Sequence, residues 1–120
     1  MSHKILIVDD HEPMRRRIRS LLEQENLNVC GEATNGREAI QKTKQLMPDL
    51  AILNISMPVL NGLEALPEIL QVAPSIKIVI FTIDDAEEIR RHAFRLGAHG
   101  YAVKSGPPED LLAEVKRLLP

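Results

Sequence analysis

The amino-acid sequence predicts an α/β fold: an open, doubly wound sheet of five parallel strands in the order 2-1-3-4-5, with helices on both faces. Short apolar runs alternate five times with stretches of helical period along the 120 residues, a pattern typical of repeated strand–helix units. The apolar runs are nearly continuous, as in strands that are buried on both faces of a parallel sheet. Because crossovers between parallel strands are right-handed, the doubly wound sheet is the simplest arrangement, and residues 1–120 are expected to form one domain.

The first half of the chain carries two strand–helix units and the third strand. The expected elements are a strand at residues 5–8, a helix over 14–22, a strand at 29–30, a turn at 35–36, a helix over 39–47 and a strand at 50–53. Asp9-Asp10 ends the first strand, and Pro13 suits the first turn of the helix that follows. Asn54 ends the third strand, at the start of a turn-forming segment that runs to Asn61-Gly62.

The second half carries the remaining helices and strands. The expected elements are a helix over residues 63–70, a strand at 76–82, a helix over 89–96, a strand at 101–104 and a helix over 111–119. Pro67 falls inside the first of these helices, where its missing N–H and its ring would kink the helix or delay its start to about Leu66. Gly97 can close the next helix in a left-handed cap. Pro107 leaves the last helix without a side-chain cap.

Composition and charge indicate a globular domain with no global electric field for nucleic acid or an anionic membrane. Hydrophobic residues make up 44% of the chain and charged residues 27%, both ordinary values, and the formal net charge is −2. No apolar run reaches the length of a membrane span, and Met1–Lys4 leads directly into a strand and not into a signal sequence. We therefore expect a cytoplasmic protein with no membrane partner. The chain stops as its last helix ends, which fits either a complete small protein or an excised piece.

Polar residues fall at the carboxyl ends of the expected strands, where doubly wound sheets bind their ligands. Asp9 and Asp10 follow the first strand, Asn54 ends the third, Thr82 the fourth and Lys104 the fifth. Taken singly, each has a purely structural explanation, such as a helix start for Asp9-Asp10. Together they favour one shared site, in which the carboxylates suit Mg²⁺ and the lysine and hydroxyl suit a phosphoryl anion.

The order of four motifs resembles that of response-regulator receiver domains, the phosphoacceptor half of two-component signalling. The motifs are ILIVDD, PDLAILNISMPVLNGLEAL, IVIFT and GAHGYAVKS, and they span essentially the whole chain. The resemblance implies a flavodoxin-like (βα)5 receiver fold and a sensor histidine kinase as partner. The phrases VDDH, ISMP with NGLEA, and GA-x-GY-x-x-K are similar to those of receivers that precede a helix-turn-helix DNA-binding output domain, which this chain does not contain.

By the same resemblance, individual residues acquire expected roles. Asp9 and Asp10 would hold Mg²⁺, with the main-chain carbonyl of Ser56 and the side chain at position 54 completing the metal site. Thr82 corresponds to the hydroxyl that moves towards the phosphoryl group, Lys104 to the cation that pairs with it, and Tyr101 to the aromatic residue that follows the hydroxyl. The fourth helix, fifth strand and last helix form the usual homodimer face, where Arg90, Arg91 and Arg95 would meet Glu109, Asp110 and Glu114.

The chain departs from the family at the phosphoacceptor position, where Asn54 replaces the expected aspartate. A neutral carboxamide is a very poor nucleophile, so the sequence predicts that transfer of a phosphoryl group from a kinase is blocked. The missing carboxylate also predicts weakened Mg²⁺ binding. Two origins stay open: an engineered block of phosphorylation and a natural pseudo-receiver. The sequence does not identify the kinase, the target genes or the oligomeric state.

Three other functions compete with that of a signalling switch. A small phosphotransferase or phosphatase would use Asp9 as its nucleophile, but Asp9 lacks an acid two residues on and no lid insertion follows, so we expect no enzyme. A flavin-binding electron carrier is disfavoured by the 2% aromatic content. Direct nucleic-acid binding would use Arg15-Arg16-Arg17 and Arg19, a run that is more often a solvated helix face.

Overall fold

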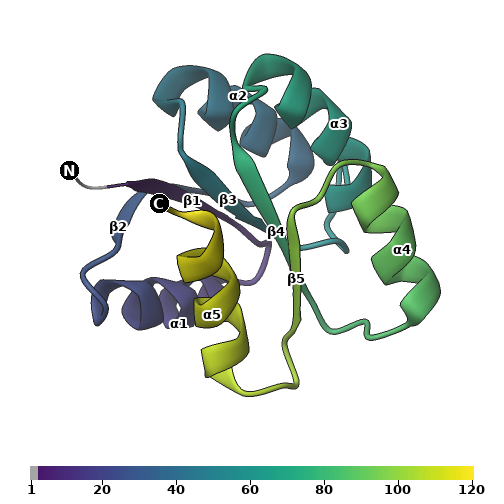
Figure 1. Cartoon of the computed structure of the whole chain (residues 1–120). Helices are drawn as coiled ribbons and strands as arrows, with labels where there is room; N and C mark the ends of the chain where they lie inside the picture. Colours follow the sequence, from purple (N-terminus) through teal and green to yellow (C-terminus); the bar gives the residue numbers. More distant parts are fainter. Residues whose placement is uncertain (1–2) are drawn as a thin grey trace.

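The computed structural model describes residues 3–120 and confirms the predicted sheet. Met1 and Ser2 begin the stretch that we expect not to be a signal sequence, and they lie outside the described residues. Five strands pair in parallel in the order β2-β1-β3-β4-β5 (Figure 1). The elements are β1 (Lys4–Val8), α1 (Glu12–Glu23), β2 (Asn28–Ala33), α2 (Gly36–Leu46), β3 (Leu50–Leu53), α3 (Gly62–Val72), β4 (Lys77–Thr82), α4 (Glu87–Arg95), β5 (Gly100–Val103) and α5 (Pro108–Leu118).

Helices cover both faces of the sheet, so the strands bury side chains in two directions (Figure 1). On one face, α1 and α5 contribute Ile18, Leu22, Leu111 and Val115 to a core with the inward side chains of the strands. On the other face, α2, α3 and α4 pack against the alternate side chains of the same strands. The strands are nearly continuous apolar runs because both of their faces are buried, as the sequence predicted. No helix in the range 3–120 combines the length and the apolar character needed to cross a bilayer.

The start of α3 differs from the expectation that Pro67 would delay it. The helix begins at Gly62, five residues before the proline. Asn61 and Glu64 form a capping box there: the Asn61 side chain accepts from the Glu64 N–H at 2.9 Å, and the Glu64 carboxylate accepts from the Asn61 N–H at 3.2 Å. These bonds satisfy two amide groups that a helix start leaves without partners. Pro67 lies on the exposed side of the helix, and the predicted delay was wrong.

Gly62 also allows a close backbone approach behind β3. A Cβ atom at this position would lie 2.0 Å from the carbonyl oxygen of Asn54, so any side chain would force the two segments apart. The Gly62 N–H donates to the Ile55 carbonyl at 2.8 Å. The loop after β3 is therefore folded back tightly onto the strand end that carries Asn54.

The remaining ends of the helices follow sequence chemistry. Asn35 is the N-cap of α2, where its side chain accepts from the Glu38 N–H at 2.8 Å, so the expected turn at residues 35–36 is the start of a helix. Gly97 has φ +115° and ends α4 in the left-handed region, as predicted. Pro107 precedes α5 without a side-chain cap, also as predicted. The helix α4 lacks such a cap too and has a single buried residue, Ala93.

His99 extends the pairing of β4 and β5 at their amino ends. Its main-chain N–H donates to the Ile78 carbonyl at 2.8 Å, and its Nδ1 accepts from the Ile78 N–H at 3.0 Å. In a protonated imidazole Nδ1 also carries a hydrogen and could not accept from the Ile78 N–H, so the bond requires the neutral ring. Burial, together with the nearby cations Lys77 and Arg117, lowers the pKa of His99 below its ordinary value.

We predict that this bond makes stability depend on pH. Because the folded-state pKa lies below the unfolded one, the contribution of His99 is present above the unfolded pKa of about 6.5 and is lost as the pH falls through the folded value. Replacing His99→Asn keeps a short acceptor but removes the titration. Urea unfolding between about pH 5 and 7.5 should show a steeper loss of stability in acid for the parent chain than for the variant. Identical pH profiles would contradict the assignment.

Candidate functional site

Five polar residues lie at the carboxyl edge of the sheet, at the places that the sequence predicted. Asp9 directly follows β1, Asn54 follows β3, Thr82 ends β4 and Lys104 follows β5. Asp9, Asn54 and Thr82 are buried, with exposed fractions of 1%, 7% and 3%. Asp10 is exposed. The edge therefore combines buried polar groups with one carboxylate open to water.

Lys104 links two of the strand ends through its ammonium group. Its Nζ donates to Asp9 Oδ2 at 2.6 Å and to Asn54 Oδ1 at 3.1 Å, and its side chain is only 10% exposed. The other carboxylate oxygen of Asp9 accepts from the His11 N–H at 2.9 Å. Buried charges are tolerated when they are paired and hydrogen-bonded in this way. The charge of Asp9 is thus matched within the chain itself.

The Asn54 amide has one orientation that its neighbours allow. Its Nδ2 donates to the Ser56 carbonyl at 2.9 Å and lies 3.4 Å from Asp10 Oδ1, while its oxygen faces the Lys104 ammonium. An ammonium group can only donate, whereas a carbonyl and a carboxylate can only accept. Turning the amide over would place N–H groups against Lys104 and oxygen against oxygen. The orientation is therefore fixed by charge and hydrogen bonding together.

Thr82 and Tyr101 form a separate network around the loop between β4 and α4. The Thr82 hydroxyl accepts from the Asp84 N–H at 3.2 Å, and the buried Tyr101 donates its hydroxyl to the Asp84 carbonyl at 2.7 Å. The Arg90 guanidinium lies 5.3 Å from the centre of the Tyr101 ring. Burial raises the pKa of Tyr101, so its hydroxyl stays protonated and keeps donating. The main-chain N–H of Lys104 donates to the Thr82 carbonyl at 2.7 Å, which joins the two networks through the backbone.

Arg15 and Glu32 support the site and were not recognised from the sequence. The sequence predicts that Arg15 belongs to a solvated arginine run, but its side chain is only 13% exposed, and its Nη1 donates to the main-chain carbonyl of Asp9 at 2.8 Å. Glu32 on β2 pairs with both Arg15 and Arg19 at 2.8 Å. Burial opposes ionisation of Glu32, yet the hydrogen bonds from the two arginines hold its pKa below the ordinary value. No local pattern signals this contact, because it joins residues 17 positions apart.

The oxygen atoms of this edge do not match the needs of Mg²⁺ as they are arranged. The ion prefers octahedral coordination by oxygen, with carboxylates that are free to bind it. Asp9 is engaged by Lys104 and His11, and the Ser56 carbonyl accepts from Asn54. Within residues 3–120, no three His, Cys, Asp or Glu side chains are grouped so that they could hold a metal. The Asn54 Nδ2 faces the Ser56 carbonyl and Asp10 Oδ1, two of the oxygens that would hold the ion.

Comparison with known proteins agrees with the fold and the motifs. The family model for the response regulator receiver domain matches residues 5–116. The nitrate/nitrite response regulator NarL of Escherichia coli (strain K12) is 39% identical over 109 residues, which are 90% of this chain and 50% of NarL. The chain thus spans about half the length of that relative. The chemotaxis protein CheY of Thermotoga maritima is 34% identical over 118 residues, 98% of each chain.

A solved structure extends the likeness to three dimensions. The CheX–CheY–BeF3–Mg complex from Borrelia burgdorferi has a TM-score of 0.92 and 24% identity, over 97% of this chain and 88% of that one. At this identity the likeness shows the shared fold. The family model, by contrast, covers most of the chain and includes every strand-end residue described above. The chain therefore belongs to the response regulator receiver domain family.

Proposed function

We propose that this chain is a two-component receiver domain that does not accept a phosphoryl group at position 54 and that communicates through protein contacts. The observation that carries the proposal is the Asn54 amide, held between Lys104 and the Ser56 carbonyl at the position where the family motif places its phosphoacceptor aspartate. Receiver domains are in general signalling proteins and not enzymes. Their ordinary input is a phosphoryl group that shifts an equilibrium between two conformations.

The chemistry of the amide explains the block. A carboxylate oxygen can attack phosphorus and form an acyl phosphate, whereas the amide oxygen carries no formal charge and its nitrogen lone pair is delocalised. Here the oxygen also accepts a hydrogen bond from the Lys104 ammonium, which withdraws electron density from it. Thr82, Lys104 and Tyr101 would keep the positions from which family members respond to the phosphoryl group, without a group to respond to.

The surroundings of Asp9 argue against the alternative function, a small phosphotransferase or phosphatase. Its carboxylate is 1% exposed and is bound on one oxygen by Lys104 and on the other by the His11 N–H. A nucleophile needs a free oxygen that faces the substrate. Both oxygens of Asp9 are already engaged, so the signalling proposal is the better supported one.

Partners follow from the family and from one surface. A sensor histidine kinase and, where the chain is a piece of a NarL-like protein, a DNA-binding output domain are the proposed partners, in the cytoplasm. A homodimer would use α4, β5 and α5, where a shallow groove of about 410 Å³ includes Arg90, Asp110 and Glu114. Glu114 is already paired with Arg117 of its own helix at 2.8 Å. That leaves Asp110 and Glu109 as the acids for the arginines of a second copy.

Restoring the carboxylate should restore phosphotransfer. With Mg²⁺ and acetyl phosphate, Asn54→Asp is expected to gain about 80 Da by mass spectrometry, because Asp9, Asp10 and Lys104 lie at the same edge of the sheet as position 54. The parent chain should gain nothing. Asn28→Asp, which adds a carboxylate at an exposed position of β2, is the matched control and should also stay unmodified. Modification of the parent chain at Asn54 would refute the block, and an inert Asn54→Asp would indicate a pseudo-receiver whose whole pocket has lost the reaction.

The affinity for Mg²⁺ should also differ between the parent chain and Asn54→Asp. Asn54 removes one negative charge from the cluster and turns N–H groups towards Ser56 and Asp10. Binding Mg²⁺ through the amide oxygen would require the amide to turn over and abandon Lys104. We therefore expect the parent chain to bind Mg²⁺ at least about tenfold more weakly than Asn54→Asp in a calorimetric titration. Equal affinities for the two proteins would show that the amide is no obstacle.

A further inference from the structure

The two asparagine–glycine pairs of the chain are protected against spontaneous deamidation. This reaction is ordinarily fastest before glycine, because the next main-chain nitrogen attacks the asparagine side chain and glycine offers the least steric hindrance. Here the N–H groups of Gly36 and Gly62 donate to main-chain carbonyls at 2.7 and 2.8 Å. The side chains of Asn35 and Asn61 are held in place as helix N-caps. Attack at either pair would therefore have to break several hydrogen bonds first.

Asn54 lacks this protection. The next residue, Ile55, is partly buried, and its N–H meets no hydrogen-bond acceptor in the range 3–120. A nitrogen without such a bond can lose its proton and approach a neighbouring carbon with no hydrogen bond to break. The Asn54 Oδ1 accepts from Lys104 Nζ at 3.1 Å. A hydrogen bond from a cation draws electron density from the amide carbon, which makes that carbon a better electrophile.

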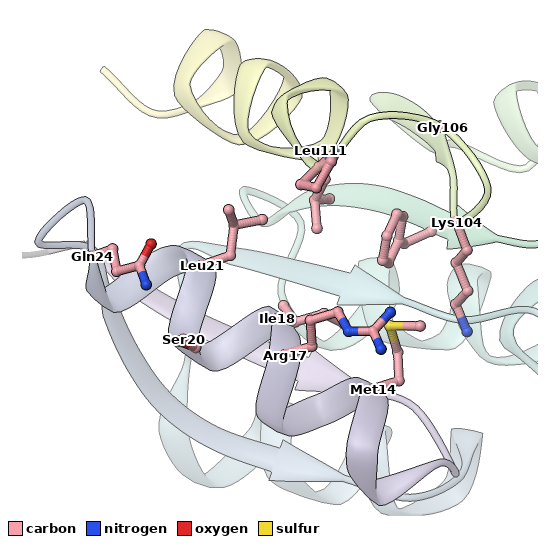
Figure 2. A pocket seen from close by; sticks show the side chains of 11 residues that line it. Met14, Arg17, Ile18, Ser20, Leu21, Gln24, Lys104, Gly106 and Leu111 are labelled. Carbon is pink, nitrogen blue, oxygen red and sulfur yellow. The ribbon is translucent and has the colours of Figure 1, made fainter.

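The surroundings of Lys104 strengthen this effect. Its side chain lines an apolar groove with Met14 and Phe81, and Figure 2 shows it as an extended arm with the ammonium nitrogen at the end. The side chain is only 10% exposed, so little water screens its charge. The branched side chain of Ile55 would hinder the attack in a flexible chain. In the folded chain the fixed ammonium opposes that hindrance, because it stabilises the negative charge that develops on the oxygen.

We propose that Asn54 is a site of spontaneous deamidation, which converts this position into aspartate as the protein ages. The Ile55 nitrogen gives up its proton to water and forms a bond to Asn54 Cγ, while the carbonyl electron pair moves onto Oδ1, beside Lys104. This pair returns as the Cγ–Nδ2 bond breaks, and the departing nitrogen takes up a proton and leaves as ammonia. The product is a succinimide ring.

Hydrolysis of the ring completes the conversion. Water adds to Cγ, the bond from Cγ to the Ile55 nitrogen breaks, and that nitrogen takes a proton back. One water is consumed and one ammonia is released overall. Addition of water at the main-chain carbonyl would give isoaspartate instead, but Lys104 lies at the Cγ oxygen, so aspartate is the expected main product.

The new carboxylate would supply the nucleophile that Asn54 does not provide. A freshly made chain would be blocked, and an ageing one would gain the capacity to accept a phosphoryl group. This consequence rests on the proposed function, whereas the deamidation itself does not.

The test incubates the whole chain for several weeks at neutral pH and physiological temperature, both folded and in urea. Each asparagine is followed by digestion at acidic pH and mass spectrometry, which detects the change from amide to acid. In the folded chain Asn54 should convert at least about tenfold faster than Asn35 and Asn61. In urea the order should reverse, because the branched residue at position 55 then hinders the attack. Asn28, which is exposed and also precedes a branched residue, should stay slower than Asn54 in the folded chain.

A pair of lysine variants tests the role of the ammonium. Lys104→Met should slow the conversion of Asn54 about tenfold or more, whereas Lys44→Met, which removes an exposed lysine from α2, should not. Asn35 and Asn61 report on folding in the same sample, because they convert quickly only when their caps open. If Lys104→Met unfolds, the comparison of the folded parent chain with the parent chain in urea decides the proposal.

Two results would overturn the proposal. One is a folded parent chain in which Asn54 converts no faster than Asn35 and Asn61, and the other is an unchanged rate in folded Lys104→Met. Acetyl phosphate and Mg²⁺ separate this proposal from the proposed function: the phosphorylated fraction of an aged sample should equal its fraction of aspartate at position 54. Deamidation without phosphorylation would support the chemistry and contradict only its consequence. Phosphorylation of a fresh chain at Asn54 would instead refute the block.

Discussion

The buried Lys104 ammonium is the interaction on which the rest of the site depends. It lies between Asp9, which is 1% exposed, and the Asn54 amide oxygen. A buried Asp9 carboxylate or Lys104 ammonium without its partner would cost several kcal/mol. The ends of β1 and β5, which carry these two groups, are therefore held together, with the end of β3 between them. The amide orientation follows from Lys104, and the hydrogen bond to the Ser56 carbonyl follows from the orientation. The tight turn that Gly62 permits then holds this strand end in place.

Much of the fold, and the membership of the strand-end cluster, could be predicted from the sequence. Continuous apolar runs allow few alternatives to a parallel sheet, and the strand ends of such a sheet meet at one edge. The start of α3 could not be predicted from Pro67 alone, because the Asn61–Glu64 capping box outweighed it. The contact of Arg15 with the Asp9 carbonyl and the direction of the Asn54 amide depend on distant residues. No local sequence pattern records such contacts.

Two hydrogen-bond networks lie at the carboxyl edge of the sheet. Asp9, Asn54 and Lys104 form one network, in which the His11 N–H and the Ser56 carbonyl supply the remaining partners. Thr82 and Tyr101 instead hold the loop before α4 through the main chain of Asp84, and α4 itself buries a single residue. The backbone bond from Lys104 to Thr82 joins the networks. An asparagine at position 54 is thus a full member of the first network and leaves the second network in place, which is compatible with the proposed loss of phosphotransfer.

A double-mutant cycle on Asp9 and Lys104 tests this account most directly. The free energy of unfolding would be measured by urea denaturation for Asp9→Asn, Lys104→Met and the double variant, without Mg²⁺ or phosphodonor. Each single change should destabilise the chain by about 3 kcal/mol, because it strands a buried charge. The double variant should lose clearly less than the sum, with a coupling of about 1 kcal/mol or more. Additive losses would show that the ammonium and the carboxylate are independent, and would contradict the claim that their pairing organises the site.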